Sequence, residues 1–179
     1  MSNPKLLLIS GSLRAGSFNS MLIREAARLF GPAEVTEGDI DLPLYHGDRE
    51  SSEGVPEKAK TLAAQVAGAD AMIIGAPEYN KGITGALKNW LDWMSRVDMP
   101  AFKGKPTVVL SASAGRTGGE TAQFMTMSCL AQFQVRLILG QGVMIAAASQ
   151  HFNDEGRLIT ETYRDMLQTR MDELRAELG

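Results

Sequence analysis

The sequence predicts one α/β domain in which a parallel β-sheet carries helices on both of its faces. Short, continuous apolar runs alternate along the 179 residues with longer amphipathic segments. Such runs are typical of strands buried on both faces, and the amphipathic segments are typical of the helices between them. Right-handed crossovers then distribute the helices over the two faces. No linker-like or repetitive stretch interrupts residues 1–179, so we expect a single domain.

The first strand is expected at residues 5–10, where a run of apolar side chains indicates burial in a sheet. The next segment has the apolar face of a helix at Leu22, Ile23, Ala26, Leu29 and Phe30. Gly31-Pro32 favours the end of that helix. Residues 33–37 alternate weakly, as an edge strand does, and the polar residues 41–54 predict a long loop.

A second helix is expected between Pro56 and Gly68, which favour a helix start and a helix end. Two further apolar runs, at residues 71–76 and 107–110, predict buried strands. The helix between these strands has its inner face at Leu87, Leu91 and Met94.

The last third of the chain continues the alternation. A helix is expected near residues 120–133, followed by strand residues at 135–139 and 143–147. Residues 160–178 predict a C-terminal helix. The pattern of strand, loop and helix thus occurs five times, which requires a layered sheet with its loops gathered at the two edges.

Composition limits the classes of function. The net charge of −3 provides no positive field that would attract nucleic acid. Cys129 is the single cysteine, which excludes an intrachain disulfide and fits a reducing compartment. The apolar run at residues 6–9 is too short for a signal peptide or a membrane span, so we expect a cytoplasmic protein. His46 and His151 have no partner at metal-ligand spacing, and no metal site is expected.

The first glycine- and hydroxyl-rich loop, residues 10–20, predicts a phosphate site. It follows a buried strand and opens a helix, whose free amide groups and positive end attract anions. The polar side chains available to a phosphate are Ser12, Arg14, Ser17, Asn19 and Ser20. A triphosphate-binding P-loop would need lysine where Ser17 stands, and the G-x-G-x-x-G dinucleotide motif is absent. A terminal phosphate monoester, as in FMN, fits this loop, although an ordinary capped turn remains the alternative.

Two more loops follow strands on the same edge. In residues 77–82, Pro77 fixes the chain direction, Tyr79 offers an aromatic wall and Asn80 offers hydrogen bonds to a planar ring. A surface turn is the alternative for this segment. Residues 111–119 are rich in unhindered amide groups that could stabilise negative charge on a flavin. Arg116, within them, would meet the cofactor, a nicotinamide phosphate or a neighbouring subunit.

These loops resemble the NAD(P)H-dependent FMN reductase family of flavodoxin-like quinone, azo-dye and metal-oxyanion reductases. The resemblance rests on Gly-Ser-Leu-Arg-x-Gly-Ser-Phe-Asn at residues 11–19 and Pro-Glu-Tyr-Asn at residues 77–80, and it covers nearly the whole chain. It implies a flavodoxin-like three-layer sandwich whose five-stranded parallel sheet has the order 2-1-3-4-5. The first loop would hold the FMN phosphate and the second would line the isoalloxazine ring. The expected cofactor-binding residues are Ser12, Arg14, Ser17, Phe18, Asn19, Ser20, Pro77, Glu78, Tyr79, Asn80, Gly82, Ser113, Gly115 and Arg116.

The implied activity is an FMN-dependent NAD(P)H oxidoreductase. Hydride would pass from NAD(P)H to bound FMN, and electrons would leave to a small acceptor such as a quinone, an azo compound or a metal oxyanion. This chemistry needs no acid–base side chain for the hydride step, so no catalytic residue is expected. The alternatives are a flavodoxin-type electron carrier with protein partners, which would present a strongly acidic face, and a protein that holds no resident flavin.

A hydrolase is a poor alternative. Ser113 lies between a strand and a helix, as a nucleophile elbow does, but the motif G-x-S-x-G would require glycine where Ser111 stands. A catalytic triad in this chain order would need its acidic residue between Ser113 and His151, and Glu120 is the only acidic residue there.

A homodimer or homotetramer is expected, partly from the resemblance. Trp90 and Trp93 lie about 60° apart on a helical wheel. With Leu87, Leu91 and Met94 directed to the sheet, at least one indole is expected to face outward beside the cofactor. Exposed aromatic side chains of this kind anchor subunit interfaces, so the flavin site is expected at or near an interface.

Overall fold

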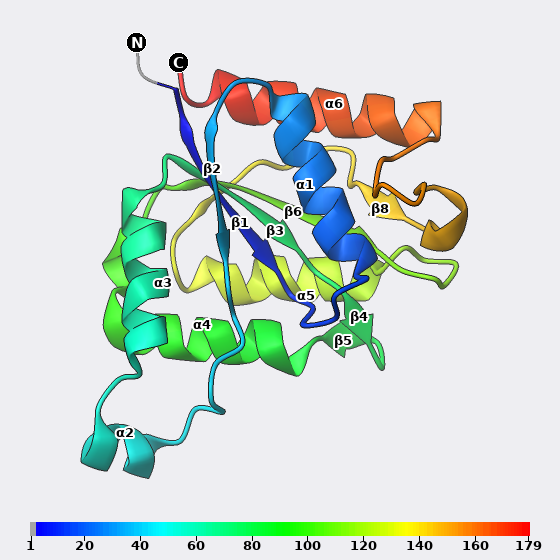
Figure 1. Cartoon of the computed structure of the whole chain (residues 1–179). Coiled ribbons are helices and arrows are strands. Elements are labelled where there is room, and N and C mark those ends of the chain that lie inside the picture. The colour runs from blue at the N-terminus through cyan, green and yellow to red at the C-terminus, as the bar shows by residue number, and fades with distance from the viewer. Residues whose placement is uncertain (1–2) are drawn as a thin grey trace.

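A computed structural model describes residues 3–179. Its central sheet is parallel and has the strand order β2-β1-β3-β6-β7, with β8 also paired to β6 (Figure 1). The bounds are β1 Lys5–Ser10, β2 Glu34–Gly38, β3 Ala71–Gly75, β6 Pro106–Ala112, β7 Arg136–Leu137 and β8 Met144–Ile145. In the central sheet β6 is the fourth strand in chain order, and β7 and β8 share the fifth position. The expected parallel sheet, its strand order and its flavodoxin-like class are therefore confirmed.

The fifth strand is divided and shorter than the sequence predicts. β7 pairs with the beginning of β6 and β8 with its end, and the chain leaves the sheet between them. Arg170, only 5% exposed, supports this excursion by donating to the carbonyl groups of Ile138 (3.1 Å) and Gln141 (2.8 Å). A Cβ atom at Gly140 would lie 2.6 Å from the Arg170 guanidinium, so the guanidinium occupies the space that a side chain there would need.

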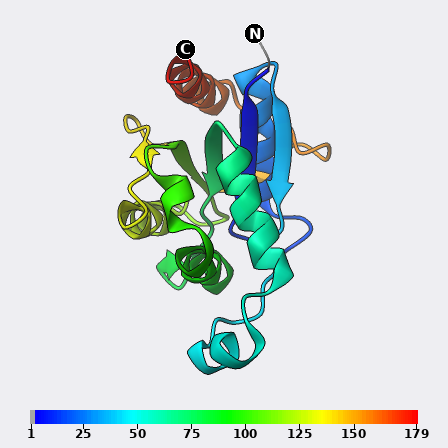
Figure 2. The same cartoon turned by 90° about the vertical axis from the view of Figure 1, so that its left-hand side faces the viewer.

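Helices cover both faces of the sheet (Figures 1 and 2). One face is packed by α1 Phe18–Phe30 and α6 Glu161–Ala176. The other is packed by α3 Glu57–Gly68, α4 Gly85–Val97 and α5 Glu120–Ala131. Alternate residues of one strand serve opposite faces, since Leu6 and Leu8 join the α1 side while Leu7 and Ile9 join the α3 side.

The segment at 41–54, expected to be a loop throughout, contains the helix α2, Gly47–Glu53. None of its residues is buried, so no apolar periodicity could reveal it. The His46 side chain caps it by accepting from the amide of Asp48 at 3.2 Å. Arg96 of α4 bonds to Glu50 of α2 at 2.9 Å. The chain also has two short 3₁₀ helices, Met99–Phe102 and Ala148–Gln150.

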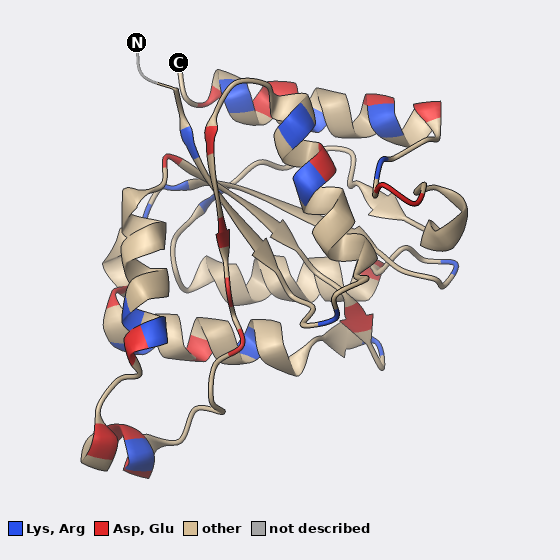
Figure 3. Ribbon diagram, in the orientation of Figure 1, with Lys and Arg blue, Asp and Glu red and all other residues tan. Residues whose placement is uncertain are grey.

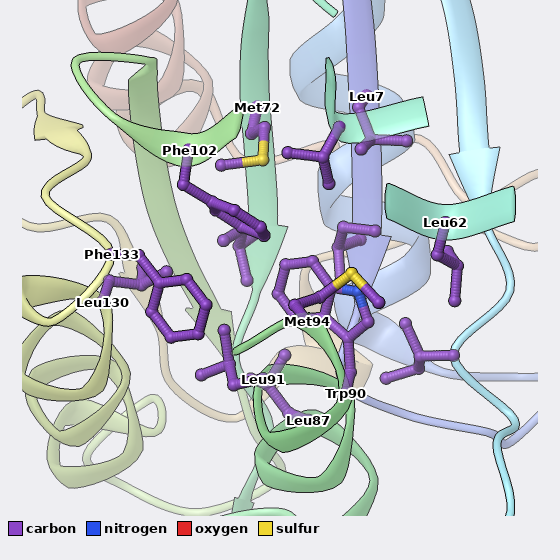
Figure 4. Packing of buried hydrophobic residues seen from close by; sticks show 14 of the residues in the cluster. Leu7, Leu62, Met72, Leu87, Trp90, Leu91, Met94, Phe102, Leu130 and Phe133 are labelled. Carbon is purple, nitrogen blue, oxygen red and sulfur yellow. The ribbon is translucent and has the colours of Figure 1, made fainter. Parts of the chain in front are cut away.

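Both tryptophans lie in the core, so the expectation of an outward indole is wrong. Trp90 is 0% exposed and packs against Phe102 with ring centroids 5.8 Å apart (Figure 4). Trp93 is 3% exposed and donates to the Pro43 carbonyl at 2.8 Å. The chain after β2 lies over α4, and Tyr45 packs edge-on against Trp93 at 5.1 Å. This covering segment, which a helical wheel cannot represent, buries the face expected to be exposed.

Within residues 3–179 no helix combines the length and the apolar character needed to cross a bilayer. The same part of the chain holds no group of three or more His, Cys, Asp or Glu side chains that could bind a metal ion. Cys129 is a free, partly buried thiol packed against the core.

Candidate cofactor-binding site

Three loops meet beyond the carboxyl ends of β1, β3 and β6, the edge at which parallel sheets bind ligands. They enclose a cavity of about 200 Å³. Its lining comprises Ser12, Arg14, Gly16, Ser17, Phe18, Asn19, Pro77, Glu78, Tyr79, Ala112, Ser113 and Ala114. Figure 3 shows basic residues, in blue, on the loops at this edge. The loops that the sequence singles out therefore do converge on one site.

Hydroxyl groups shape the first loop. Ser17 caps α1 by accepting from the amide of Ser20 at 3.4 Å. The hydroxyl groups of Ser10 and Ser20 lie 2.7 Å apart, and Ser10 also accepts from the amide of Ser12 at 3.3 Å. Ser20 is thus engaged behind the loop and does not line the cavity. Ser10, which sequence reasoning missed as a support, belongs to the strand rather than to the turn.

Arg14 is the unpaired cation of this loop. Its side chain is exposed, and it forms no ion pair or side-chain hydrogen bond within residues 3–179. Arg14 lines the same cavity as the start of α1, where amide groups are free. A free guanidinium, a helix N-terminus and the hydroxyl group of Ser12 form a donor set suited to a phosphate monoester.

Asn19 has a different environment from the one expected. It is 3% exposed, its Nδ2 donates to the Ala112 carbonyl at 2.8 Å, and its Oδ1 accepts from the Ala112 amide at 3.1 Å. One amide hydrogen is left for a ligand. Phe18, beside it, stacks on Phe152 at 5.9 Å and lines the cavity.

A tight contact fixes the first loop against the second. The Gly11 amide donates to the Gly75 carbonyl at 2.8 Å, and the Thr84 hydroxyl donates to the Gly11 carbonyl at 2.7 Å. A Cβ atom at Gly11 would lie 2.7 Å from Pro77 Cδ. Only glycine fits this position without displacing Pro77, which lines the cavity.

The second loop is a β-hairpin formed by β4 Glu78–Tyr79 and β5 Gly82–Ile83. Asn80 and Lys81 occupy its turn with φ values of 51° and 64°, as a type I′ turn requires. Tyr79 is 52% exposed and lines the cavity. Asn80 and Gly82 belong to the hairpin but do not line the cavity.

Glu78 turns its carboxylate toward α5. The side chain is 10% exposed, accepts from the amides of Thr121 (3.0 Å) and Ala122 (3.4 Å), and pairs with Lys81 at 3.2 Å. Burial alone would raise the pKa of Glu78, but the ion pair and the two amides hold that pKa below its ordinary value. The group is a carboxylate at neutral pH.

The third loop contributes Ser113 and Ala114 to the cavity, whereas Gly115 and Arg116 lie outside its lining. Gly118 has a φ of 64°, and a Cβ there would lie 2.6 Å from the Met144 backbone, so the loop runs closely past β8. The Ser113 hydroxyl lies 3.5 Å from the Gly115 carbonyl. Within residues 3–179 no histidine bonds to it, which leaves the hydrolase alternative without a base.

Sequence reasoning missed Gly16, Ala112 and Ala114 as lining residues. Gly16 belongs to the phosphate-loop motif, so its place in that motif was the available signal. The two alanines have no polar side chain, and only their position at the end of β6 could have indicated them.

The site fits FMN on the chemistry of its donors and surfaces. Arg14 and the start of α1 suit the phosphate, and Pro77 and the exposed face of Tyr79 provide a flat wall for the ring. The fold and this site define a flavodoxin-like protein with a phosphate-bearing planar cofactor.

Comparison with known proteins agrees. The model of the NADPH-dependent FMN reductase family matches residues 4–150. An NAD(P)H-dependent FMN reductase of Pseudomonas aeruginosa is 39% identical over 172 residues, covering 95% of this chain and 92% of that protein. A 2-hydroxy-1,4-benzoquinone reductase of a Burkholderia species is 34% identical, covering 96% of this chain and 94% of that protein.

Among solved structures, the flavoenzyme NAD(P)H:(acceptor) oxidoreductase FerB of Paracoccus denitrificans superimposes with a TM-score of 0.84. It is 26% identical, and the match covers 98% of this chain and 97% of FerB. The chain belongs to the NADPH-dependent FMN reductase family. The expected class of enzyme, an FMN-dependent NAD(P)H oxidoreductase, and the expected FMN and NAD(P)H are thereby confirmed.

Proposed function

We propose that this oxidoreductase delivers electrons to small acceptors, with quinones as the principal class and azo compounds and metal oxyanions as secondary ones. The observation that carries the proposal is that the unpaired Arg14 and the Pro77–Tyr79 wall line one and the same cavity. Relatives that are named quinone reductases support quinones as the acceptor class. With the ring of FMN against the Pro77–Tyr79 wall, its other face would be open, and a planar acceptor would stack on that face better than a bulky one.

FMN in this site would accept hydride from the nicotinamide donor and release electrons to the acceptor. Arg14, Ser12 and the first turn of α1 would hold its phosphate. Pro77 and Tyr79 would orient the ring. Arg116 is exposed, lies outside the cavity lining and has no acidic partner in the described part of the chain, so it would meet a phosphate of the nicotinamide donor or a neighbouring subunit.

Proton donors are scarce at the cavity. Glu78 is the only carboxylate in its lining, and that group is already held by Lys81 and two amides of α5. We therefore assign no acid–base side chain, and the protons of the reduced acceptor would come from water. The proposal extends to a homo-oligomer in the cytoplasm. The exposed apolar side chains of Phe124 and Met125 on α5 support the oligomer, and the lone Cys129 supports the cytoplasm.

Steady-state kinetics test the proposal. NADPH oxidation should require an acceptor and should be fastest with a quinone. The double-reciprocal lines for NADPH and 1,4-benzoquinone should be parallel, because one open cavity must admit the two substrates in turn. Intersecting lines would mean that both bind together, against a single cavity. A yellow protein that oxidises no NADPH with any of the three acceptor classes would instead be a flavodoxin-type electron carrier.

A further inference from the structure

We infer that Glu78 is a positioning residue whose carboxylate fastens the hairpin β4–β5 to the start of α5 and so sets the width of the ring-binding slot. The inference rests on the proposed function to the extent that the slot holds FMN. The resemblance implies contact between Glu78 and the ring, whereas the geometry gives its carboxylate another partner.

The start of α5 depends on this carboxylate. Its N-cap is Gly119, which has no side chain, so no side chain of its own segment caps the amides of Thr121 and Ala122, whereas the Glu120 amide donates to the Thr117 carbonyl at 3.2 Å. Glu78 Oε2 accepts from two of these amides, those of Thr121 and Ala122, from a position 43 residues earlier than Thr121. A carboxylate at a helix N-terminus also interacts favourably with the helix dipole.

The hairpin depends on the same carboxylate. Lys81 lies in the left-handed region at a φ of 64° without the freedom of glycine, which disfavours the turn. Its Nζ lies 3.2 Å from Glu78 Oε1. One carboxylate therefore uses one oxygen for the turn of the hairpin and the other for α5.

A second contact shows that the two elements pack closely. A Cβ atom at Gly82 would lie 3.6 Å from the Sδ of Met125 in α5. Tyr79, the next residue after Glu78, pairs with Gly82 across the hairpin, is exposed and lines the cavity. Loss of the Glu78 carboxylate should therefore let Tyr79 move relative to the phosphate loop.

The test compares Glu78→Ala and Glu78→Gln with Glu120→Gln. Glu120 lies in the first turn of α5 and is exposed, so its variant removes a charge from the same helix end without touching the hairpin. Each variant is titrated with FMN after removal of the cofactor. We expect the Kd of Glu78→Ala to rise about tenfold, the value for losing charged hydrogen bonds. Glu78→Gln keeps one acceptor oxygen for α5 but loses the ion pair with Lys81, so its Kd should rise by about threefold. Glu120→Gln should match the wild type.

The visible circular dichroism of bound FMN provides the second measurement, because it reports how the ring is held. Glu78→Ala should change this spectrum most, and Glu78→Gln should change it to a smaller extent. An unchanged Kd and spectrum in Glu78→Ala would overturn the inference. If Glu78→Ala does not fold, the test rests on Glu78→Gln. A threefold or larger rise in its Kd for FMN, about 0.65 kcal/mol, together with an altered spectrum supports the inference. A wild-type Kd and spectrum reject it. A wild-type protein that takes up no FMN would defeat the proposed function itself, whereas FMN binding indifferent to Glu78 defeats only this inference.

Discussion

The side chain of Asn19 forms two hydrogen bonds with the backbone of Ala112, a residue 93 positions further along the chain. The amide nitrogen donates to the carbonyl at 2.8 Å, and the amide oxygen accepts from the N–H at 3.1 Å. This pair joins the second residue of α1 to the last residue of β6. The loop for the phosphate and the loop after β6 are thereby held in one arrangement.

Asn19→Ala should lower the free energy of unfolding by about 2–4 kcal/mol, because it leaves two buried polar groups of Ala112 without partners. Urea unfolding of the two proteins measures the difference. Asn3→Ala is the matched control, since Asn3 is exposed and should change stability little. An Asn19→Ala midpoint equal to that of the wild type would show that the pair contributes nothing.

Arg14→Ala should weaken FMN binding by about 10- to 150-fold, the range for a hydrogen bond to a charged group. The fold should persist, because Arg14 is exposed and has no ion pair within residues 3–179. Fluorescence titration of the apoprotein gives the dissociation constant. Arg49→Ala, an exposed arginine of α2, should leave it unchanged. Equal dissociation constants for the wild type and Arg14→Ala would remove Arg14 from the site.

Glu25 should make stability depend on pH. It is 2% exposed and bonds to Arg28 at 2.7 Å and to Arg157 at 3.3 Å. Burial raises its pKa, but the two guanidinium groups outweigh burial and the net pKa lies below the ordinary value. A lowered folded-state pKa stabilises the fold above the unfolded pKa, and that stabilisation is lost as the pH falls through the folded value.

The comparison of wild type with Glu25→Gln measures this contribution. At pH 7 the variant should be less stable by about 1–3 kcal/mol, because it loses charged hydrogen bonds to partly exposed partners. The difference should shrink as the pH falls from 7 through the lowered folded-state pKa of Glu25, below which both proteins are neutral at this position. Glu155→Gln, an exposed change nearby, is the control. A difference that stays constant as the pH falls would contradict the assignment.

The periodicity of apolar residues predicted the sheet, and the composition of the loops predicted the edge at which they meet. Buried strands such as β1 and β3 have uninterrupted apolar runs, so their order of appearance predicted the layers. α2 has no buried residue and gives no such signal. The turn at Asn80 and Lys81 could not be predicted either, because the usual sequence signal of a type I′ hairpin includes glycine and this turn has none.

Side-chain partners were the second thing that the sequence could not provide. Glu78 and Asn19 occur in the motifs of the loops, but their partners Thr121 and Ala112 lie in distant segments. Trp93 is covered by the chain near Pro43 for the same reason. Motif resemblance identifies which residues gather at a site, whereas the direction of each side chain depends on contacts made only in the folded protein.

Because both tryptophans are buried, we propose that a subunit interface, if the protein dimerises, lies on α5 instead. Phe124 is 58% exposed and Met125 is 41% exposed, and Tyr79 at the cavity is 52% exposed. Met125 approaches the hairpin at Gly82, so this apolar surface extends toward the cofactor site. Exposed apolar side chains of this size mark interaction sites, and a patch that is complementary to itself closes a symmetric dimer.

Phe124→Asp should therefore convert a dimeric wild type into a monomer, because it places a charge in an apolar contact. Sedimentation velocity measures the change, and FMN titration of the same samples shows whether the interface contributes to the site. Leu139→Asp is the control, since Leu139 is 67% exposed and lies in the excursion between β7 and β8. A wild-type protein that sediments as a monomer with bound FMN and full turnover would refute the interface, whereas a dimer that survives Phe124→Asp would place the contact on another surface.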